Sequence, residues 1–485
     1  MYKHYDKYEA VIGLEVHAQL LTQSKAYSGD KNEYGAIPNT LVSPLTLAHP
    51  GTLPRFNERL LEHAIKLGIA CNCDIRRENQ FARKNYFYGD MPKGYQITQD
   101  KTPICTGGYI QVKTAEGDTK KITLTRIHME EDSGKSIHDQ DPFNTLIDLN
   151  RAGVPLLEMV SEPELRSGEE AYSYLTEVRK LVRYLDVCDG NMEEGSMRCD
   201  ANISVRLRGA KEFGIPVEVK NMNSIRNVQR AIEFEINRQV ECYENGEEIF
   251  KETRSFDAAA GNTFSMRSKE AANDYRYFPE PDLLPVIVHQ EQIEAIRSKM
   301  PALPGELVKK YTSKLGLSEY DALLITDSKS IALYFEELIS HTNNYKGAAN
   351  WLMGQVKSFL NEKGIHISEF PISPAKLAEL ISLVDENKVS NSVASQKIYP
   401  LLIENPEQSP QSIAKENNWI QESNEGALSE FIDAAITKFP GKVAEYKSGK
   451  TGLLGLFMGE VMKLSQGKAD PKMASQLLRK KLEEN

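Results

Sequence analysis

A run of alternating side chains near the N-terminus, from Glu9 to Leu20, constrains the fold of this chain more than any other feature. Its apolar residues share one parity and its polar residues the other: Leu14, Val16, Ala18 and Leu20 against Glu15, His17 and Gln19. Because successive side chains of a strand point to opposite faces, the run predicts a half-buried β-strand. Glu15 and His17 would lie about 7 Å apart on the polar face, at ~3.3 Å of rise per residue, so both could bind one metal ion. A solvated face with a chance histidine is the alternative.

Three later acidic stretches favour the metal-site interpretation. The strand-like run Lys120 to Met129 leads into Glu130-Glu131-Asp132, and three adjacent acids repel one another unless a cation or solvent neutralises them. Glu158 and Glu162 share a parity on the strand that is predicted after a Gly-Pro turn. A third strand and a shorter fourth one each carry polar residues on one face: Asp200, Asn202, Ser204 and Arg206, then Glu218 and Lys220. Polar-faced strands that converge on one site indicate an α+β domain.

The second half of the chain has a different character. From Gln290 onward apolar residues recur with helical spacing, and proline-containing breaks occur near Pro301, Pro371 and Asn405. We therefore predict three domains: an α+β domain over residues 1–290, a helical domain over 291–405 and a helical tail over 406–485.

The composition argues against several classes of protein. No apolar run approaches the ~20 residues that span a bilayer, and the polar start lacks the apolar stretch of a signal peptide, so we expect a cytoplasmic protein. Six cysteines without a CxxC pair indicate neither a disulfide framework nor a cysteine zinc site. The net charge of −10 argues against a generally basic surface, but residues 441–485 carry nine Lys and Arg against five Asp and Glu, a local charge of +4. An ordinary solvated helical surface would also explain this basic end.

The stretch from Phe81 to Gln96 alternates aromatic residues with cations, among them Arg83, Lys84 and Lys93. Planar rings among cations suit a base and its phosphates, and a packed loop with snorkelling lysines is the alternative. The Gly-Lys-Ser and Gly-Lys-Thr tripeptides of the chain lack the glycine that a P-loop needs five residues earlier. If the chain uses ATP, a metal-rich cradle would have to hold it.

Seven long motifs are distributed over most of the chain: Val-Ile-Gly-Leu-Glu-Val-His (11–17), Arg-Lys-Asn-Tyr-Phe-Tyr (83–88), His-Met-Glu-Glu-Asp (128–132), Asp-Leu-Asn-Arg-Ala-Gly-Val-Pro-Leu-Leu-Glu (148–158), Met-Glu-Glu-Gly-Ser-Met-Arg-Cys-Asp-Ala-Asn (192–202), Lys-Asn-Met-Asn-Ser (220–224) and Asp-Tyr-Arg-Tyr-Phe-Pro-Glu-Pro-Asp (274–282). Together they resemble the B subunit of the tRNA-dependent amidotransferase. That enzyme converts Glu-tRNA(Gln) to Gln-tRNA(Gln), or Asp-tRNA(Asn) to Asn-tRNA(Asn).

The resemblance implies a cradle-shaped antiparallel-sheet domain, distantly related in shape to glutamine synthetase, followed by two helical domains of which the last contacts tRNA. It implies that ATP phosphorylates the side-chain carboxylate of the misacylated amino acid, and that ammonia then displaces the phosphate. Ammonia would come from glutamine, which is hydrolysed on an amidase-type A subunit, and a small C subunit would complete the heterotrimer. The sequence leaves open which misacylated tRNA is the substrate.

Carried over residue by residue, the resemblance places the magnesium site and catalysis at Glu15, His17, Glu131 and Glu158, with Glu130 and Glu162 as weaker candidates. Carboxylates are the hard ligands that Mg²⁺ prefers, and the imidazole suggests that Mn²⁺ also fits. We further predict ATP or substrate contacts, each with a structural ion pair as its alternative, at eight residues: Arg83, Lys84, Tyr86, Lys93, Arg198, Asp200, Asn202 and Lys220.

One departure from the family concerns zinc. Many members carry two CxC or CxxC pairs in a stretch that corresponds to about Tyr27 to Leu47, where this chain has no cysteine. We therefore predict that the chain binds no structural zinc, and that packing or a polar network holds this loop.

Two other functions compete with a catalytic subunit. A non-catalytic tRNA-binding scaffold would gain nothing from packing Glu15, Glu131 and Glu158 together and would suffer their repulsion. A free-standing ATP-dependent carboxylate–amine ligase using free ammonia would not need a helical C-terminal half with a basic end. Because the glutaminase signature of the A subunit is missing, we expect glutamine-dependent activity to require a second chain.

Overall fold

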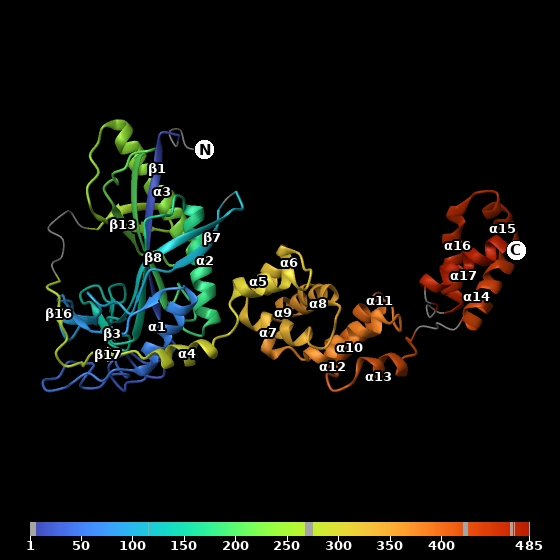
Figure 1. The fold of residues 1–485 in the computed structure, drawn as a ribbon, viewed down its shortest axis with the longest axis horizontal. Coiled ribbons are helices and arrows are strands. Elements are labelled where there is room, and N and C mark those ends of the chain that lie inside the picture. The colour runs from blue at the N-terminus through green and yellow to red at the C-terminus, as the bar shows by residue number, and fades with distance from the viewer. Residues whose placement is uncertain are drawn as a thin grey trace. The chain divides into compact units, whose positions relative to one another are not determined.

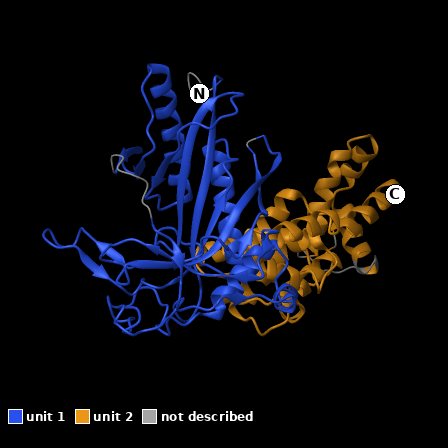
Figure 2. Cartoon of the chain, turned by 60° about the vertical axis from the view of Figure 1, so that its left-hand side comes forward, with its two compact units in different colours: residues 1–303 blue, residues 304–485 orange. Residues whose placement is uncertain are grey.

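The computed structural model describes residues 6–114, 116–266, 275–420, 425–465, 469 and 471–484. The chain forms two compact units, residues 1–303 and 304–485 (Figure 2). The prediction of an α+β class, with an antiparallel-sheet domain first and helices after it, is confirmed. The predicted domain boundaries at residues 290 and 405, and the likeness to glutamine synthetase, stay predictions.

A ten-stranded sheet with the order β15-β14-β13-β12-β1-β11-β8-β6-β2 organises the first unit, and β7 pairs with β8 (Figure 1). Its strands are β1 (Tyr8–Gln19), β2 (Asp74–Ile75), β6 (Cys105–Thr106), β7 (Tyr109–Lys113), β8 (Thr119–Glu131), β11 (Pro155–Ser161), β12 (Met197–Leu207), β13 (Val217–Lys220), β14 (Thr253–Asp257) and β15 (Asn262–Ser265). All of the pairings are antiparallel except that between β13 and β14. The strand that the alternation predicts is therefore β1, which lies between β11 and β12.

One face of this sheet forms the core of the unit. On β1, the side chains of Leu14, Val16 and Ala18 are fully buried, as the alternation predicts. The helices α1 (Glu58–Ala70), α2 (Gly168–Tyr184) and α3 (Ile225–Asn245) contact the strands, and α4 (Gln290–Ser298) contacts α1. Buried apolar residues of these helices join those of the strands in one cluster. The side chains of the alternate residues on the central strands point to the other face of the sheet, and these are mainly polar.

Short sheets and loops surround the large sheet. They contain β16 (Phe278–Pro279) with β4 (Ala82–Asn85) and β5 (Tyr95–Thr98), β9 (Lys135–Ile137) with β10 (Leu146–Asp148), and β17 (Val286–Ile287) with β3 (Glu78–Asn79). In the loop from about Tyr27 to Leu47, the carboxylate of Asp30 accepts hydrogen bonds of 2.9 Å from the backbone and the hydroxyl of Ser43, and a further one from Thr46. A polar network therefore holds this loop, and the expectation of no zinc stays a prediction.

The second unit is helical throughout its described part. Its α-helices are α5 (Pro304–Ser313), α6 (Glu319–Ile325), α7 (Lys329–Leu338), α8 (Tyr345–Trp351), α9 (Lys357–Lys363), α10 (Pro374–Asp385), α11 (Asn391–Val393), α12 (Tyr399–Glu404), α13 (Pro410–Glu416), α14 (Glu425–Lys438), α15 (Pro440–Lys447), α16 (Leu454–Leu464) and α17 (Pro471–Glu484). Leu428, Phe457 and Leu478 anchor a buried cluster between α14, α16 and α17. No described helix has the length and apolar character needed to cross a membrane.

Candidate active site

The polar face of four neighbouring strands carries a row of paired side chains. In the register of the sheet, His128 on β8 lies opposite Glu158 on β11, Glu158 lies opposite His17 on β1, and His17 lies opposite Arg198 on β12. Directly opposed side chains of antiparallel strands have Cβ atoms about 5 Å apart. The alternation of each strand and the sheet register thus bring residues from four distant parts of the sequence into contact.

Around this row, His17, Glu130 and Glu158 form a buried acidic cluster that we call the histidine cluster. The Oε2 atom of Glu158 lies 3.3 Å from His17 Nε2 and 3.2 Å from His128 Nε2. Glu130 accepts hydrogen bonds from Gln96 at 3.0 Å and lies 2.9 Å from His128 Nε2. One potential ligand atom from each of the three cluster residues lies within 4.8 Å of the others. Their spacing allows one divalent cation to contact all three.

The charges of the histidine cluster are strongly coupled. Burial alone would lower the pKa of His128, but the Glu130 and Glu158 carboxylates raise it to about 9. Burial also opposes a charge on His17, yet its hydrogen bond to Glu158 raises its pKa. Burial would raise the pKa of Glu158, but the hydrogen bonds from both imidazoles hold it well below its ordinary value. Protons on the imidazoles therefore compensate the buried carboxylates, and a metal ion would displace the proton of a ligating imidazole.

A second acidic cluster, Glu15, Asp200 and Glu218, lies beside the first on the same face. Its ligand atoms also lie within 4.8 Å of one another. Lys220 bridges the second cluster, with an ion pair to Asp200 and another of 2.9 Å to Glu218. Burial, and then the charges of Glu158 and Asp200, raise the pKa of Glu15. We call this group the β1–β13 cluster, and Lys220 pairs with two of its three carboxylates.

Both clusters lie at a cavity of about 630 Å³ that is lined by His17, Glu130, Asp200 and Lys220, among other residues. Arg198 donates at 2.8 Å to Asp132, which directly follows β8 and lines the same cavity. The cavity is also lined by Lys84 and Tyr86 from the β4–β5 hairpin. A cavity with two carboxylate clusters and flanking cations suits a metal–phosphate ligand better than an apolar one.

Lys84 is a half-buried cation at this cavity. Burial disfavours its charge, but the carboxylates of Glu130 and Glu158 raise the pKa of Lys84 above its ordinary value. Among the ion pairs of the described residues, none within 4.0 Å involves Lys84. Its ammonium group lies over the ring of Tyr275 and is attracted by the more distant carboxylates, which suits a cation that meets an incoming anion.

Glu131 lies away from both clusters. Because neighbouring residues of a strand face opposite sides, Glu131 points away from the side occupied by Glu130. Its carboxylate forms an ion pair with Lys93 and accepts a hydrogen bond of 2.9 Å from the backbone of Ile97. These contacts place it in a small pocket with Tyr27 rather than in the large cavity. The grouping of Glu131 with Glu15, His17 and Glu158 stays a prediction, which the geometry of the described residues does not favour over Glu130.

The remaining predicted residues divide into those at the cavity and those outside it. Arg83 donates to Glu280 at 2.7 and 2.9 Å and to Asp282 at 3.1 Å, as in the structural alternative. Glu162 accepts from the hydroxyl of Thr125 at 2.7 Å. The predicted residues close to the clusters are Lys84, Tyr86, Arg198, Asp200, Asn202 and Lys220, and Asn202 donates to Glu15 at 2.9 Å.

Sequence reasoning missed His128, Gln96 and Asp132 as site residues. His128 has the parity of Glu130 on β8, and Asp132 lies just beyond the end of that strand, so the alternation of the strand, extended by one residue, could have found both. Gln96 could not be found in this way, because it comes from another strand and reaches both Glu130 and the backbone carbonyl of Glu131, at 2.6 Å.

The donors of both clusters fit a divalent cation. The β1–β13 cluster offers only carboxylate oxygens, which suit Mg²⁺, and the histidine cluster adds one imidazole, which Mn²⁺ accepts more readily. The unpartnered Nδ1 atom of His128 is buried, and its Nε2 atom is engaged by Glu130 and Glu158, so His128 serves as a neighbour that orients them.

Comparisons with known proteins give matches over nearly the whole chain. Residues 10–294 match the family described as the GatB/GatE catalytic domain, and residues 333–482 match the GatB domain. A relative in Trichodesmium erythraeum is 48% identical, with 98% of both chains covered. A relative in Thermodesulfovibrio yellowstonii is 45% identical, with 99% of this chain and 100% of the relative covered, and one in Chlorobium limicola is 47% identical, with 98% and 100% covered. All three are named as the B subunit of an aspartyl/glutamyl-tRNA(Asn/Gln) amidotransferase.

Proposed function

Since the chain belongs to the family of aspartyl/glutamyl-tRNA(Asn/Gln) amidotransferase B subunits, we propose that its cavity activates and amidates the side-chain carboxylate of a misacylated tRNA. The substrate would be Glu-tRNA(Gln), Asp-tRNA(Asn) or both. The observation that carries this proposal is the convergence of His17, Glu130 and Glu158 in a buried cluster beside a polar cavity.

Amidation of a carboxylate needs an activated leaving group, because expulsion of hydroxide or oxide is unfavourable. In the proposed reaction a carboxylate oxygen of the aminoacyl group attacks the γ-phosphorus of ATP, and ADP leaves. Ammonia then attacks the carbonyl carbon of the acyl phosphate, inorganic phosphate leaves, and the amide remains. Phosphoryl transfer of this kind depends on position and charge compensation more than on a covalent protein nucleophile.

The residues of the chain supply position and charge. The carboxylates of the two clusters would hold Mg²⁺ or Mn²⁺, which would supply positive charge to compensate the phosphate groups. Lys84 and Arg198 lie at the same cavity and would attract the phosphate oxygens. Asp132 accepts from Gln19 at 2.7 Å and from Arg198 at 2.8 Å, and these bonds orient the guanidinium at the edge of the cavity.

The partner chains follow from the same proposal. An amidase-type A subunit would hydrolyse glutamine and deliver ammonia, and a small C subunit would complete a heterotrimer in the cytoplasm. The helical tail, residues 406–485, would contact the tRNA through its basic end. The relatives are named as B subunits, which supports an assembly with further subunits.

The test uses the complex with its partner subunits, Glu-tRNA, ATP and Mg²⁺, with either glutamine or ammonium as the nitrogen source. We expect Glu158→Gln to lower amidation about 100-fold or more with both sources, because it removes a ligand charge and the carboxylate that lies against both imidazoles. Glutamine hydrolysis measured without tRNA should stay near the wild-type rate, because it belongs to the partner.

Glu169→Gln is the matched control, since Glu169 is exposed in the first turn of α2 and lies outside both clusters. It should amidate like the wild type. If Glu158→Gln amidates as fast as this control in both nitrogen sources, the metal-site proposal is wrong and a tRNA-binding scaffold explains the chain better.

A further inference from the structure

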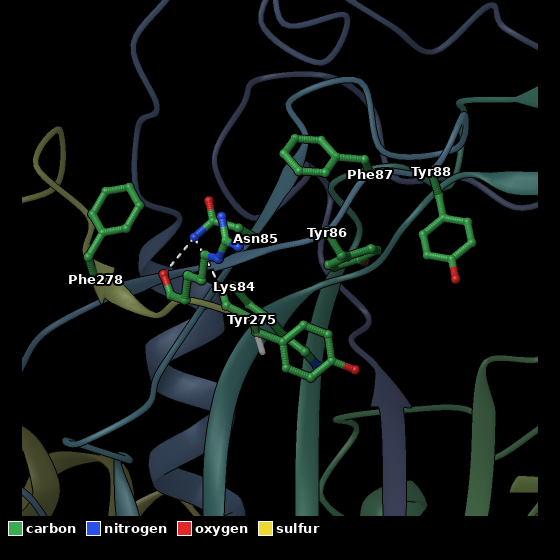
Figure 3. Close-up of a pocket in the computed structure, with 8 residues that line it drawn as sticks. Lys84, Asn85, Tyr86, Phe87, Tyr88, Tyr275 and Phe278 are labelled. Atoms are coloured by element: carbon green, nitrogen blue, oxygen red, sulfur yellow. Dashed lines mark hydrogen bonds between the residues drawn. The ribbon is translucent and has the colours of Figure 1, made fainter. Parts of the chain in front are cut away.

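A second cavity of about 770 Å³ is lined mainly by aromatic rings (Figure 3). It lies beside the 630 Å³ cavity, which we call the active-site cavity. We call it the aromatic pocket and define it by its lining residues: Lys84, Asn85, Tyr86, Phe87, Tyr88, Tyr275, Arg276 and Phe278. Lys84 and Tyr86 line both cavities. The two cavities thus adjoin each other at the end of β4, and a ligand that reaches from one to the other would pass these two side chains.

The rings of the aromatic pocket are presented to solvent. Phe87 is 89% exposed, Tyr88 51% and Phe278 45%. Figure 3 shows Phe278 on one side of Lys84 and Asn85, and Tyr86, Phe87 and Tyr88 on the other. Exposure of several rings next to one another is unfavourable in water, so this patch indicates a binding surface rather than scattered surface apolar residues.

Hydrogen bonds from Asn85 and close packing against Gly94 hold the segments that carry these rings in place. The side-chain amide of Asn85 donates to the carbonyl of Tyr275 at 3.2 Å and to that of Arg276 at 2.8 Å. The ring of Phe87 lies against Gly94, where an added Cβ would come within 3.1 Å of it. Gly94 also has a φ of +72°, which other residues rarely adopt. The pocket is therefore built by the β4–β5 hairpin and the segment before β16.

The pocket also carries positive charge. The ammonium group of Lys84 lies 5.0 Å from the centre of the Tyr275 ring, which is within cation–π distance. A second cation, Arg276, lines the same pocket. Rings together with cations favour a stacked base whose phosphates lie close by.

We propose that the aromatic pocket binds the 3′-terminal adenosine of the misacylated tRNA, with Phe87 as a stacking platform. This inference rests on the proposed function, because it assigns one part of the same substrate. The reacting amino acid is an ester of the ribose of that adenosine, so its base lies only a few bonds from the carboxylate that enters the active-site cavity. A base subsite must therefore adjoin that cavity, and the aromatic pocket does so through Lys84 and Tyr86.

The shape of the pocket favours the tRNA over ATP as the source of the base. ATP carries one base, whereas the unpaired 3′ end of a tRNA presents several successive bases, which match several exposed rings. A polynucleotide must also continue from its terminal residue into solvent. The open position of Phe87 and Tyr88 allows this, whereas a small nucleotide would be better held in an enclosed site.

The test isolates the contribution of the base with two small probes. One is 3′-amino-3′-deoxyadenosine with glutamate attached to the 3′-amine, a stable mimic of the tRNA end, and the other is the same compound without the base. Their inhibition of Glu-tRNA amidation by the complex gives two inhibition constants, and calorimetry gives their dissociation constants independently of activity. For the wild type we expect the base to tighten binding about 5- to 100-fold, the range that one stacked base contributes.

Phe87→Ala should reduce the gain from the base to about twofold or less, and Phe87→Tyr, which keeps a ring, should retain it. Phe143→Ala is the matched control, because Phe143 is 91% exposed and lies outside the aromatic pocket. It should behave like the wild type. Phe87→Ala should also raise the KM for Glu-tRNA while leaving the KM for ATP unchanged.

Three results would overturn the inference. The gain from the base could persist in Phe87→Ala, the KM for ATP could rise instead of that for tRNA, or the variant could lose its partner subunits, which would make the pocket a protein interface. If the wild-type complex forms no amide at all, the proposed function fails, while calorimetry still measures the base subsite. If the wild-type complex amidates normally and any of the three results is found, the aromatic pocket is not the adenosine subsite and the proposed function still stands.

Discussion

Replacement of Arg83 separates the two interpretations that the sequence leaves open for this residue. Its guanidinium donates two hydrogen bonds to Glu280, whose side chain is fully buried, and one to Asp282. Arg83→Met removes these donors but keeps most of the aliphatic volume. If the role of Arg83 is structural, the variant should lose local stability and keep its affinity for ATP.

The contacts of Glu280 set the size of the effect. Breaking one side of a buried ion pair costs about 3–5 kcal/mol, because the other charge stays behind without a partner. Here the backbone of Asp282 still donates to Glu280 at 2.9 Å, and 18% of the Arg83 side chain is exposed to water. We therefore expect a lower figure of about 2–3 kcal/mol. Since 1.4 kcal/mol is a factor of ten, local opening should become about 30- to 150-fold more frequent.

Hydrogen–deuterium exchange of peptides that cover β4 and β16 measures this opening directly. Arg83→Met with Glu280→Gln should recover most of the lost protection, because no buried charge is left unpaired. Arg226→Met, at an exposed position of α3, is the matched control and should exchange like the wild type. Unchanged exchange in Arg83→Met, together with a KM for ATP raised tenfold or more, would refute the structural interpretation.

Other predictions concern the metal clusters and the tail. Glu130→Gln should weaken Mn²⁺ binding about tenfold or more, as measured by electron paramagnetic resonance. Glu131→Gln should leave the Mn²⁺ affinity within twofold, since only Glu130 faces the histidine cluster. Equal losses of affinity in the two variants would contradict this assignment. Glu15→Gln should raise the thermal stability of the metal-free chain, because it removes the cost of burying this charge and its repulsion by Glu158 and Asp200. The same change should reduce the stabilisation by added Mg²⁺, and a lower stability without metal would oppose this reasoning. Deletion of residues 405–485 should weaken tRNA binding and reduce its dependence on salt concentration, because the basic end of the tail is lost. Mn²⁺ binding should persist. An unchanged tRNA affinity would contradict the proposed role of the tail.

The sequence predicts the central strand well because its pattern is local. Alternation over Glu9 to Leu20 specifies both the strand and its two faces, and β1 buries Leu14 and Val16 as expected. The same argument, applied to β8, separates Glu130 from Glu131, since adjacent residues of a strand cannot share a face. A motif match treats the two as nearly equivalent, and the parity of the strand is the physical property that distinguishes them.

Sequence patterns could not predict the contacts between residues that are far apart in the chain. Arg83 and Glu280 are 197 positions apart, and no local periodicity predicts their pairing. The partner of Lys93 was likewise unpredictable, because the hairpin that carries it approaches β8 only through the tertiary fold. Cations that a sequence offers for phosphate binding can therefore be assigned only after their carboxylate partners are known, and of the two adjacent cations in this motif Lys84, not Arg83, lies at the active-site cavity.

The order in which acidic and basic side chains follow one another across the sheet explains how the charges of the buried carboxylates in the first unit are compensated. In the row that crosses β8, β11 and β1, the carboxylate of Glu158 lies between the imidazoles of His128 and His17, which share its charge. In the next row the neighbours of Glu15 are Val160 and Asp200, so this carboxylate has no imidazole in its row, and the cation of Lys220 contacts Asp200 and Glu218 instead. The metal-free protein is therefore nearly compensated at the histidine cluster and under-compensated at Glu15. A divalent cation at these carboxylates would therefore gain most of its electrostatic stabilisation at Glu15, on the central strand.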